Sequence, residues 1–400
     1  MITHTSYSSE LAHYRNRYIK TLYDDIVPFW FPRCLDHDVG GYLTSYDRRG
    51  RLVDTDKSVW AQGRMSWMLS EMASGKDSSS SMPFVDWSEL GISFLERCAF
   101  DTDGRMFFQL TRAGKPVRKR RYAYSEAFAS IAYAARAVHR QSEGLATKAR
   151  ALFEHFVDWN FIPGAMPPKF TEHREMTGMG PRMIALVTAR ELADKLGDDE
   201  FLGGWRNRMI EEIARLFVKD DLEAVMESVG PKGELIDCYE GRLLNPGHAL
   251  EGAWFVLKEA DLSGRKDWLD LGLRMLSYMW KRGWDREYGG LNYFVDLKGL
   301  PVQEYWHEMK FWWPHNEAMV ATLYAYVLTG QEKYWEWHKM VSNWSFEYLA
   351  DPDFGEWFGY LRANGEPSSE LKGNLWKSFF HLPRALLECI RLFDRCAKPQ

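Results

Sequence analysis

The sequence has few cysteines and no long apolar run. Its cysteines (Cys34, Cys98, Cys238, Cys389 and Cys396) are odd in number and lack metal-binding or redox spacing. No stretch approaches the roughly 18 consecutive apolar residues of a membrane-spanning helix. The N-terminal segment MITHTSYSSELAHYRNRY also lacks the apolar core of a signal peptide. These absences predict a reduced, soluble, cytoplasmic protein that does not enter a membrane.

The sequence also lacks an excess of basic charge and several catalytic motifs. A formal net charge of −5 gives no reason to expect nucleic acid or an acidic membrane as a partner. Neither the HExxH motif of zinc enzymes nor the G-x-S-x-G elbow of serine hydrolases occurs. The segment SGKDSSSSM (74–82) lacks the first glycine of a nucleotide-binding P-loop, so we interpret it as a polar loop.

Aromatic residues, in contrast, are abundant. They make up 15% of the chain, which contains 18 tryptophans. Rings at this density suit a large core. They also suit a deep pocket in which tryptophan faces hold a sugar.

One sequence plan recurs along the chain. Acidic residues, a glycine, alternating aromatic or β-branched residues and a second glycine turn are typical of a short β-hairpin. The plan is clear at 35–53, 100–117, 284–302 and 351–367, and weaker at 159–178 and 228–247. A helical pattern follows each segment, beginning at Ser58, Ala123, Gly180, Gly247, Pro314 and His381. Six such units predict an all-α protein, an (α/α)6 barrel with short β-hairpins at one end, formed by residues 1–400 as a single domain.

The segment NPGHALEGAW (245–254) places His248 in the first turn of the fourth of these helices, with Glu251 on the same face. If the six inner helices run parallel, their first turns meet at one end of the barrel. Helix N-termini there favour developing negative charge. The residues expected at this end are Arg64, Tyr124, Glu126, Met183, His248, Glu251, His315, Asn316, Glu317, His381 and Arg384.

Two neutral histidines on either side of one carbon suit removal of a proton on one face and its return on the other. An arginine facing them could stabilise the enediolate that forms beside a sugar aldehyde. Glu251 and Glu317 could hold the histidine tautomers. These residue types indicate epimerisation next to a sugar aldehyde, without a redox cofactor.

Two other kinds of chemistry are weaker alternatives. A glycosidase would use two carboxylates among Glu126, Glu251 and Glu317, but the histidines would then be idle. The spacings of His248 with Glu251 and of His315 with Glu317 are not diagnostic of a metal, so no metal site is predicted.

Six segments together resemble the N-acylglucosamine 2-epimerase family, nearly end to end: DKSVWAQGRMSWM, RYAYSEAFA, NPGHALEGAW, KFWWPHNEAM, EWFGYLRANG and KSFFHLPRALLE. The resemblance implies an (α/α)6 barrel that interconverts N-acetylglucosamine and N-acetylmannosamine by ring opening and deprotonation at C2. By motif, the essential arginine, helix-start histidine, glutamate and C-terminal histidine of the family correspond to Arg64, His248, Glu317 and His381. On this correspondence His248 and His381 are the acid/base pair. Predicted substrate contacts are Glu251 (from the GHxxE motif), Tyr124, Asn316 and Trp313, although Trp313 could instead pack in the barrel wall.

Relatives on the same scaffold leave alternatives open. They include cellobiose 2-epimerases and aldose–ketose isomerases that act on mannose-type sugars, and a non-catalytic binding protein is a further alternative. The resemblance implies an additional histidine on the third inner helix of cellobiose epimerases, where this chain has Met183, and this favours the N-acyl hexosamine branch.

The resemblance also implies activation by ATP or a related nucleotide, although the chemistry requires no cofactor. The basic run at 115–121 is interpreted as a solvated hairpin end, with an anion site as the alternative. The amphipathic C-terminal helix could support a homodimer.

Overall fold

The computed structural model describes residues 4–75, 82–120, 123–167 and 169–396. Contacts group the chain into two compact units. The first unit comprises Met1–Phe31, Ala214–Glu370 and His381–Gln400, and the second comprises Pro32–Ile213 and Leu371–Phe380. Most of segment 74–82, interpreted above as a polar loop, and Arg121 of the basic run lie outside the described residues.

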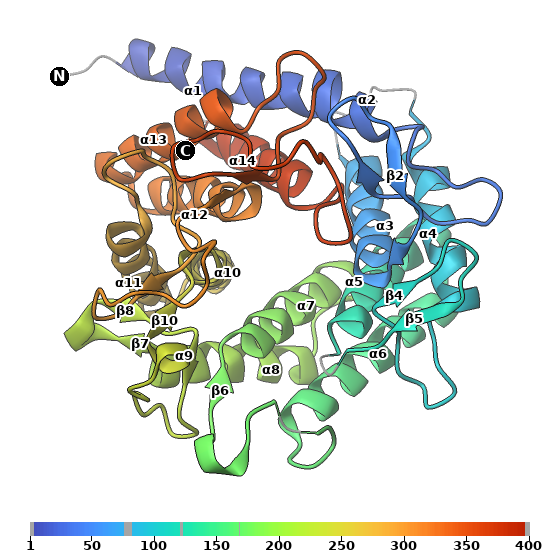
Figure 1. Cartoon of the computed structure of the whole chain (residues 1–400), viewed down its shortest axis with the longest axis horizontal. Coiled ribbons are helices and arrows are strands. Elements are labelled where there is room, and N and C mark those ends of the chain that lie inside the picture. The colour runs from blue at the N-terminus through green and yellow to red at the C-terminus, as the bar shows by residue number, and fades with distance from the viewer. Residues whose placement is uncertain (1–3, 76–81, 121–122, 168, 397–400) are drawn as a thin grey trace. The chain divides into compact units, whose positions relative to one another are not determined.

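The second unit consists of three helix pairs in its described part (Figure 1). Its helices are α3 (Val59–Ser74), α4 (Phe84–Cys98), α5 (Tyr124–Arg140), α6 (Glu143–Phe161), α7 (Gly180–Leu196) and α8 (Glu200–Glu212). The opening helices α3, α5 and α7 pack side by side, and each also packs on the helix that follows it. Close approach requires glycine at Gly63 of α3, because a Cβ there would lie 2.8 Å from the backbone carbonyl of Phe128 on α5.

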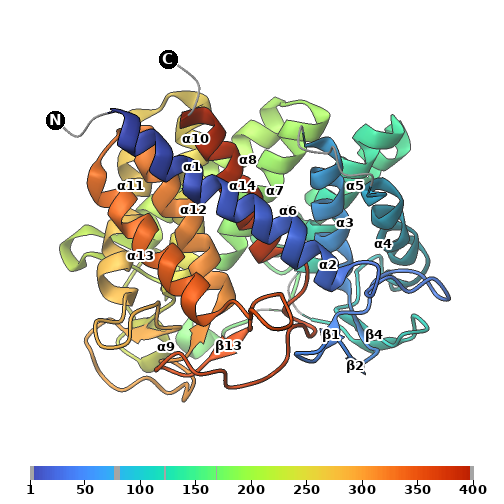
Figure 2. The same cartoon turned by 90° about the horizontal axis from the view of Figure 1, so that it is seen from above.

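The first unit repeats this arrangement. Its helices are α1 (His4–Lys20), α2 (Val27–Trp30), α9 (Tyr239–Arg242), α10 (Pro246–Ser263), α11 (Lys266–Gly283), α12 (Trp312–Thr329), α13 (Glu332–Tyr348) and α14 (His381–Cys396). The opening helices α10, α12 and α14 pack side by side, with α11 on α10 and α13 on α12. The N-terminal helix α1 lies against α13 and α14 (Figure 2) and so completes the sixth helix pair in the described part of the chain.

The six predicted helix starts are confirmed, each within two residues of the observed start. The C-terminal helix, however, does not present the free apolar face that suggested a homodimer. Nearly all of α14 is buried, because α12 and α1 cover it within the first unit.

The strands are short. They are β1 (Ser45–Tyr46), β2 (Leu52–Asp54), β3 (Lys57–Ser58), β4 (Gln109–Leu110), β5 (Pro116–Arg118), β6 (Thr177–Gly178), β7 (Val218–Lys219), β8 (Ala224–Val225), β9 (Ser228–Val229), β10 (Leu243–Leu244), β11 (Val295–Asp296), β12 (Lys310–Phe311) and β13 (Tyr360–Leu361). The pairs β1–β2, β4–β5 and β7–β8 are antiparallel hairpins. In addition, β3, β10 and β12 pair with β4, β11 and β13. Because β3, β10 and β12 run directly into α3, α10 and α12, the paired strands lie at the N-terminal ends of these helices.

The weak hairpin expected at 159–178 is absent from its described residues. There α6 continues to Phe161, and the short 3₁₀ helix η2 (Glu172–Arg174) and β6 follow. Pro163 and Pro167 explain the difference, because proline cannot donate to a strand ladder.

Buried lysines tie two of the turn segments to the helices that they precede. Lys57 Nζ donates to Asp36 Oδ2 at 2.8 Å, and Lys310 Nζ donates to Asp285 Oδ2 at 2.6 Å. Both lysines are fully buried, and burial lowers the pKa of each despite the carboxylate partner. Two distant repeats of the chain therefore use the same internal ion pair.

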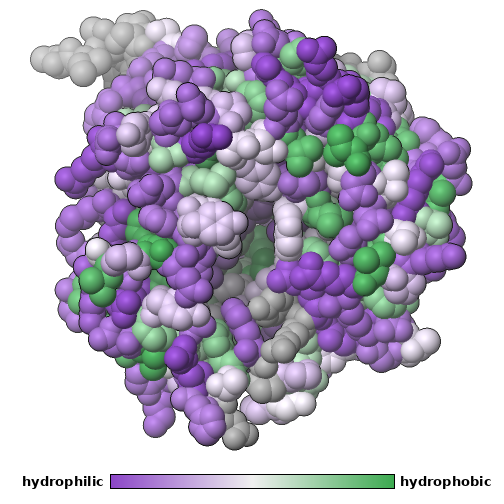
Figure 3. All heavy atoms as spheres, in the orientation of Figure 1, coloured by the Kyte–Doolittle hydropathy of each residue, from purple (hydrophilic) through white to green (hydrophobic). Residues whose placement is uncertain are grey.

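The face of the molecule shown in Figure 3 is mostly hydrophilic, with small scattered hydrophobic areas. Within the described residues, no helix combines the length and the apolar character needed to cross a bilayer. All five cysteines are free.

Candidate active site

The start of α10 is built by its NPG sequence. Asn245 Oδ1 accepts a hydrogen bond from the backbone N–H of His248 at 3.1 Å, and Pro246 is the first helical residue. A Cβ on Gly247 would lie 2.6 Å from the Trp313 ring. Glycine therefore lets Trp313 approach the end of α10, and the cap fixes the backbone that carries His248.

His248 Nδ1 faces a carboxylate from outside its own helix. It lies 3.0 Å from both Oε1 and Oε2 of Glu227, which sits between β8 and β9. The His248 side chain keeps 36% of its surface exposed. A partly accessible imidazole with one nitrogen held by a carboxylate has the arrangement of a general base.

His381, the first residue of α14, has a matching but more deeply buried partner. Its Nδ1 lies 2.7 Å from Oε1 of the fully buried Glu317 on α12. The second Glu317 oxygen accepts a hydrogen bond from Trp254 Nε1 on α10 at 2.8 Å. Glu317 thereby joins all three opening helices of the first unit.

Arg384 supplies the positive charge at this carboxylate. Its Nη2 donates to Glu317 Oε1 at 2.5 Å and to Glu251 Oε1 at 2.8 Å. Burial alone would lower the Arg384 pKa, but Glu317 and Glu251 hold it above its usual value. Glu251, Glu317 and His381 bring metal-type donor atoms within 4.8 Å of one another. The guanidinium already donates to both carboxylates, so the residues form an ion-paired network and we propose no metal there.

The Trp313 ring contacts both imidazoles. Its centroid lies 5.1 Å from that of His248 and 5.8 Å from that of His381. Tyr293 meets the indole edge-on, with the ring planes at 90°. The two histidines therefore border one shared aromatic surface.

Asn316 lies beside this network on α12. Its side chain is fully buried, and neither Oδ1 nor Nδ2 has a hydrogen-bond partner among the described residues. A buried amide without partners is costly. This feature is consistent with the predicted substrate contact of Asn316.

Arg64 and Tyr124 belong to the second unit. The Arg64 guanidinium carbon lies 4.0 Å from the Phe128 ring centroid and 4.6 Å from that of Phe380. The Tyr124 hydroxyl lies against Gly180 at the start of α7, where a Cβ would come within 2.9 Å of it. Tyr124 begins α5 as expected, whereas Arg64 is the sixth residue of α3 and so lies in its second turn. Their membership of the site remains a prediction.

Glu126 and His315 have structural roles instead. In three repeats a first-turn side chain accepts a backbone N–H of the preceding turn segment: Gln62 from Tyr42, Glu126 from Met106 and His315 from Leu291. His315 Nδ1 donates to Phe311 O, and burial lowers the His315 pKa to about 3. A fully buried, neutral imidazole with both nitrogens engaged cannot exchange protons with a substrate, so the expectation that His315 lines the site is wrong.

Sequence reasoning missed one contributor to the network, Glu227, and one interaction, the double ion pair of Arg384. Glu227 precedes His248 by 21 residues, and no helical spacing links a turn residue to a histidine so far along the chain. Arg384 was expected among the first-turn residues, but its double ion pair was not. The expectation that both Glu251 and Glu317 hold histidines is met by Glu317, whereas Glu251 binds Arg384 and Glu227 contacts His248.

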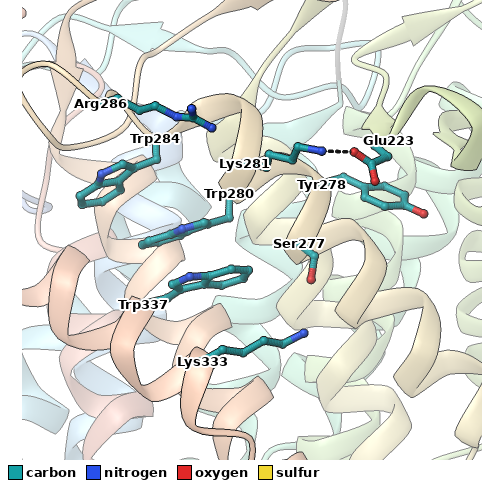
Figure 4. A pocket seen from close by; sticks show the side chains of 9 residues that line it. All are labelled: Glu223, Ser277, Tyr278, Trp280, Lys281, Trp284, Arg286, Lys333 and Trp337. Carbon is teal, nitrogen blue, oxygen red and sulfur yellow. Dashed lines mark hydrogen bonds and ion pairs between the residues drawn. The ribbon is translucent and has the colours of Figure 1, made fainter.

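A separate groove of about 430 Å³ lies on α11 and α13 of the first unit. In it Trp280 stacks on Trp284 and on Trp337, with centroids 4.7 and 5.0 Å apart (Figure 4). None of the histidine-site residues described above lines this groove.

Comparison with known proteins identifies the class of fold. The solved structure of cellobiose 2-epimerase from Bacillus thermoamylovorans superposes with a TM-score of 0.82 at 20% identity, covering 95% of this chain and 99% of that one. The chain therefore has the (α/α)6-barrel fold of the sugar epimerases, as predicted.

Sequence comparison then identifies the family. A model described as N-acylglucosamine 2-epimerase (GlcNAc 2-epimerase) matches residues 41–385. N-acylglucosamine 2-epimerase from Bos taurus is 32% identical over 96% of this chain and 92% of that protein. Cellobiose 2-epimerase from Ruminococcus albus is 25% identical over 92% of this chain and 96% of that protein. The chain belongs to the N-acylglucosamine 2-epimerase family.

Proposed function

We propose that this chain is a sugar 2-epimerase that interconverts N-acetylglucosamine and N-acetylmannosamine. The observation that carries the proposal is the pair of imidazoles, His248 and His381, each with Nδ1 on a carboxylate and both bordering Trp313. Because a carboxylate holds Nδ1, we assign the proton exchange to Nε2 of each ring. Greater identity to the bovine N-acylglucosamine epimerase than to the Ruminococcus cellobiose epimerase supports the N-acyl hexosamine as substrate.

The proposed reaction begins with the ring-opened sugar. One histidine removes the proton at C2, and the C2–H electron pair moves into the enolate of the C1 aldehyde, whose oxygen Arg64 stabilises. The other histidine then donates a proton to the opposite face of C2. Glu317 holds His381 for this exchange, while Glu251, Tyr124, Asn316 and Trp313 bind the substrate. The reaction needs no cofactor for its chemistry.

The test is proton NMR of the purified protein with N-acetylmannosamine in D2O. We expect N-acetylglucosamine to appear with deuterium at C2. If no product forms, the same measurement with mannose, glucose and cellobiose distinguishes a sister activity on this barrel from a binding protein. Product from one of these sugars contradicts the proposed substrate, and no product from any contradicts the enzyme.

We further propose activation by ATP, a homodimeric state and a cytoplasmic location. In the described part of the basic run, Lys119 is bound by Asp101 and Asp103, so the nucleotide proposal rests on the family alone. The free state of all five cysteines supports a reducing compartment. Repeating the NMR measurement with and without ATP tests activation, and sedimentation equilibrium tests the dimer.

A further inference from the structure

The carboxylate that faces His248 comes from a tightly held backbone segment. Met226 N, one residue before Glu227, donates to Phe217 O at 2.9 Å, and Val225 and Ser228 on either side are buried. Glu227 itself keeps 23% of its side chain exposed. The turn therefore holds the backbone that carries Glu227, and the carboxylate lies at the edge of solvent.

Both Glu227 oxygens lie 3.0 Å from the same ring nitrogen, His248 Nδ1. Among the described residues, His248 is the hydrogen-bond and ion-pair partner of Glu227. A carboxylate in this position keeps the proton of the neutral imidazole on Nδ1 and places the lone pair on Nε2. It also stabilises the imidazolium that forms when Nε2 takes a proton.

Glu317, the carboxylate that faces His381, has a cationic partner of its own. Glu317 faces His381, but its Oε1 also accepts a 2.5 Å hydrogen bond from Arg384. The guanidinium is shared between Glu317 and Glu251, so it offsets part of the negative charge that would otherwise stabilise a positive His381. No such cation is paired with Glu227 in the part of the chain that the structure describes.

We propose that Glu227 is the positioning residue of His248, holding its Nδ1–H tautomer and favouring proton uptake at Nε2. This inference rests on the proposed epimerase function and assigns Glu227 to one direction of the epimerisation reaction. Glu227 therefore affects deprotonation of the epimer whose C2 proton faces His248. Glu317 with Arg384 affects deprotonation of the epimer whose C2 proton faces His381.

The test follows deuterium entry at C2 of each epimer separately, as initial rates in D2O. His248→Ala first identifies the epimer whose exchange depends on His248. Glu227→Gln, which keeps an acceptor oxygen but loses the charge, is expected to slow exchange into that epimer by about 10-fold. Glu227→Leu, which removes the acceptor as well, is expected to slow it by about 10²- to 10⁴-fold. Exchange into the other epimer should stay within about two-fold of wild type in both variants.

Glu223→Gln is the matched control, because it removes a carboxylate from the same β7–β9 segment whose partner is Lys281. It should exchange both epimers like the wild type. Equal loss in both directions in the Glu227 variants would show a structural role and overturn the inference, as would unchanged rates. Absence of exchange in the wild type would instead contradict the proposed function.

A second measurement does not depend on turnover. Nitrogen-15 NMR of the imidazoles should show His248 with its proton on Nδ1 in the wild type and in Glu223→Gln. In Glu227→Leu the proton should redistribute toward Nε2. An unchanged tautomer in Glu227→Leu would overturn the inference, whichever sugar the enzyme uses.

Discussion

At the scale of single residues, a histidine in a first turn has two possible roles here, and its hydrogen-bond partners decide between them. His248 and His381 each have Nδ1 on a carboxylate, whereas His315 accepts a backbone N–H and is fully buried. The sequence cannot separate these roles, because all three histidines lie in the first turns of equivalent helices.

We expect His248→Ala and His381→Ala each to lower epimerisation by at least about 10³-fold, because inversion needs a proton donor on the face opposite the base. Each variant should still exchange deuterium into one epimer without inverting it, and the retained epimer should differ between the two. NMR in D2O measures both quantities, and circular dichroism checks the fold. Substantial inversion at C2 by either variant would contradict the two-base mechanism.

Local chemistry explains why some of the site was predictable. Asn245 and Pro246 mark the start of α10 in the sequence, so the position of His248 followed directly. The partners of the proposed catalytic residues could not be predicted in this way. Glu227 comes from a turn, and the pairing of Arg384 with both Glu317 and Glu251 depends on how α10, α12 and α14 pack.

At the scale of secondary-structure elements, buried ion pairs fix the turn segments to the helices that follow. Lys310→Met should lower the free energy of unfolding by about 3–5 kcal/mol, because it leaves Asp285 without its buried cation. Urea denaturation measures the change. The exposed pair of Lys281 with Glu223 is the control, and Lys281→Met should cost about 0–1 kcal/mol. Adding Asp285→Asn to Lys310→Met should recover part of the loss, and a loss no larger than that of the control would contradict a structural ion pair.

Two buried histidines of α12 and α13 make the stability of the first unit depend on pH. Burial lowers the pKa of His315 and of His338 to about 3, from an ordinary value of 6.5. As the pH falls below about 6.5, the unfolded chain binds protons that the folded chain does not, so stability should fall by up to about 1.4 kcal/mol per pH unit for each histidine. Above that pH these two groups should contribute no slope.

Urea denaturation at pH 7.5, 6.5 and 5.5 tests this dependence. His338→Gln should reduce the slope below pH 6.5, whereas His13→Gln, which changes an exposed histidine, should leave it unchanged. A stability that stays constant between pH 7.5 and 5.5 would contradict the neutral state of both buried rings.

The turn segments show where a sequence pattern predicted a hairpin correctly and where it did not. Glycine pairs marked real turns, as at Gly40–Gly41 and Gly289–Gly290, where both residues have positive φ. The proline-containing segment 159–178 had acidic and aromatic residues but no glycine pair, and it formed no hairpin in its described part. Segment 100–117 also lacks a glycine pair but forms the β4–β5 hairpin, so the prolines of 159–178 account for the difference.

At the scale of the whole molecule, the family match over residues 41–385 spans both units. The chain passes between the units at 31–32, 213–214, 370–371 and 380–381, so neither unit is one continuous segment. Because the chain crosses between the units at these positions, unfolding one unit leaves the segments of the other without their covalent attachment to folded structure. We therefore expect a single cooperative transition, in agreement with the predicted single domain, and a calorimetric enthalpy equal to the van't Hoff enthalpy. Two separate heat-absorption peaks would contradict it.

The buried lysines have a consequence for chemical labelling. Lys57 lies in the second unit and Lys310 in the first, and each ammonium group is inaccessible to an amine-reactive reagent while its turn segment is closed. Each lysine can react only when its own segment opens. Mass spectrometry of the two labelled peptides over time would therefore report the opening of each unit separately. The labelling rates of Lys57 and Lys310 thus give one opening rate in each of the two units.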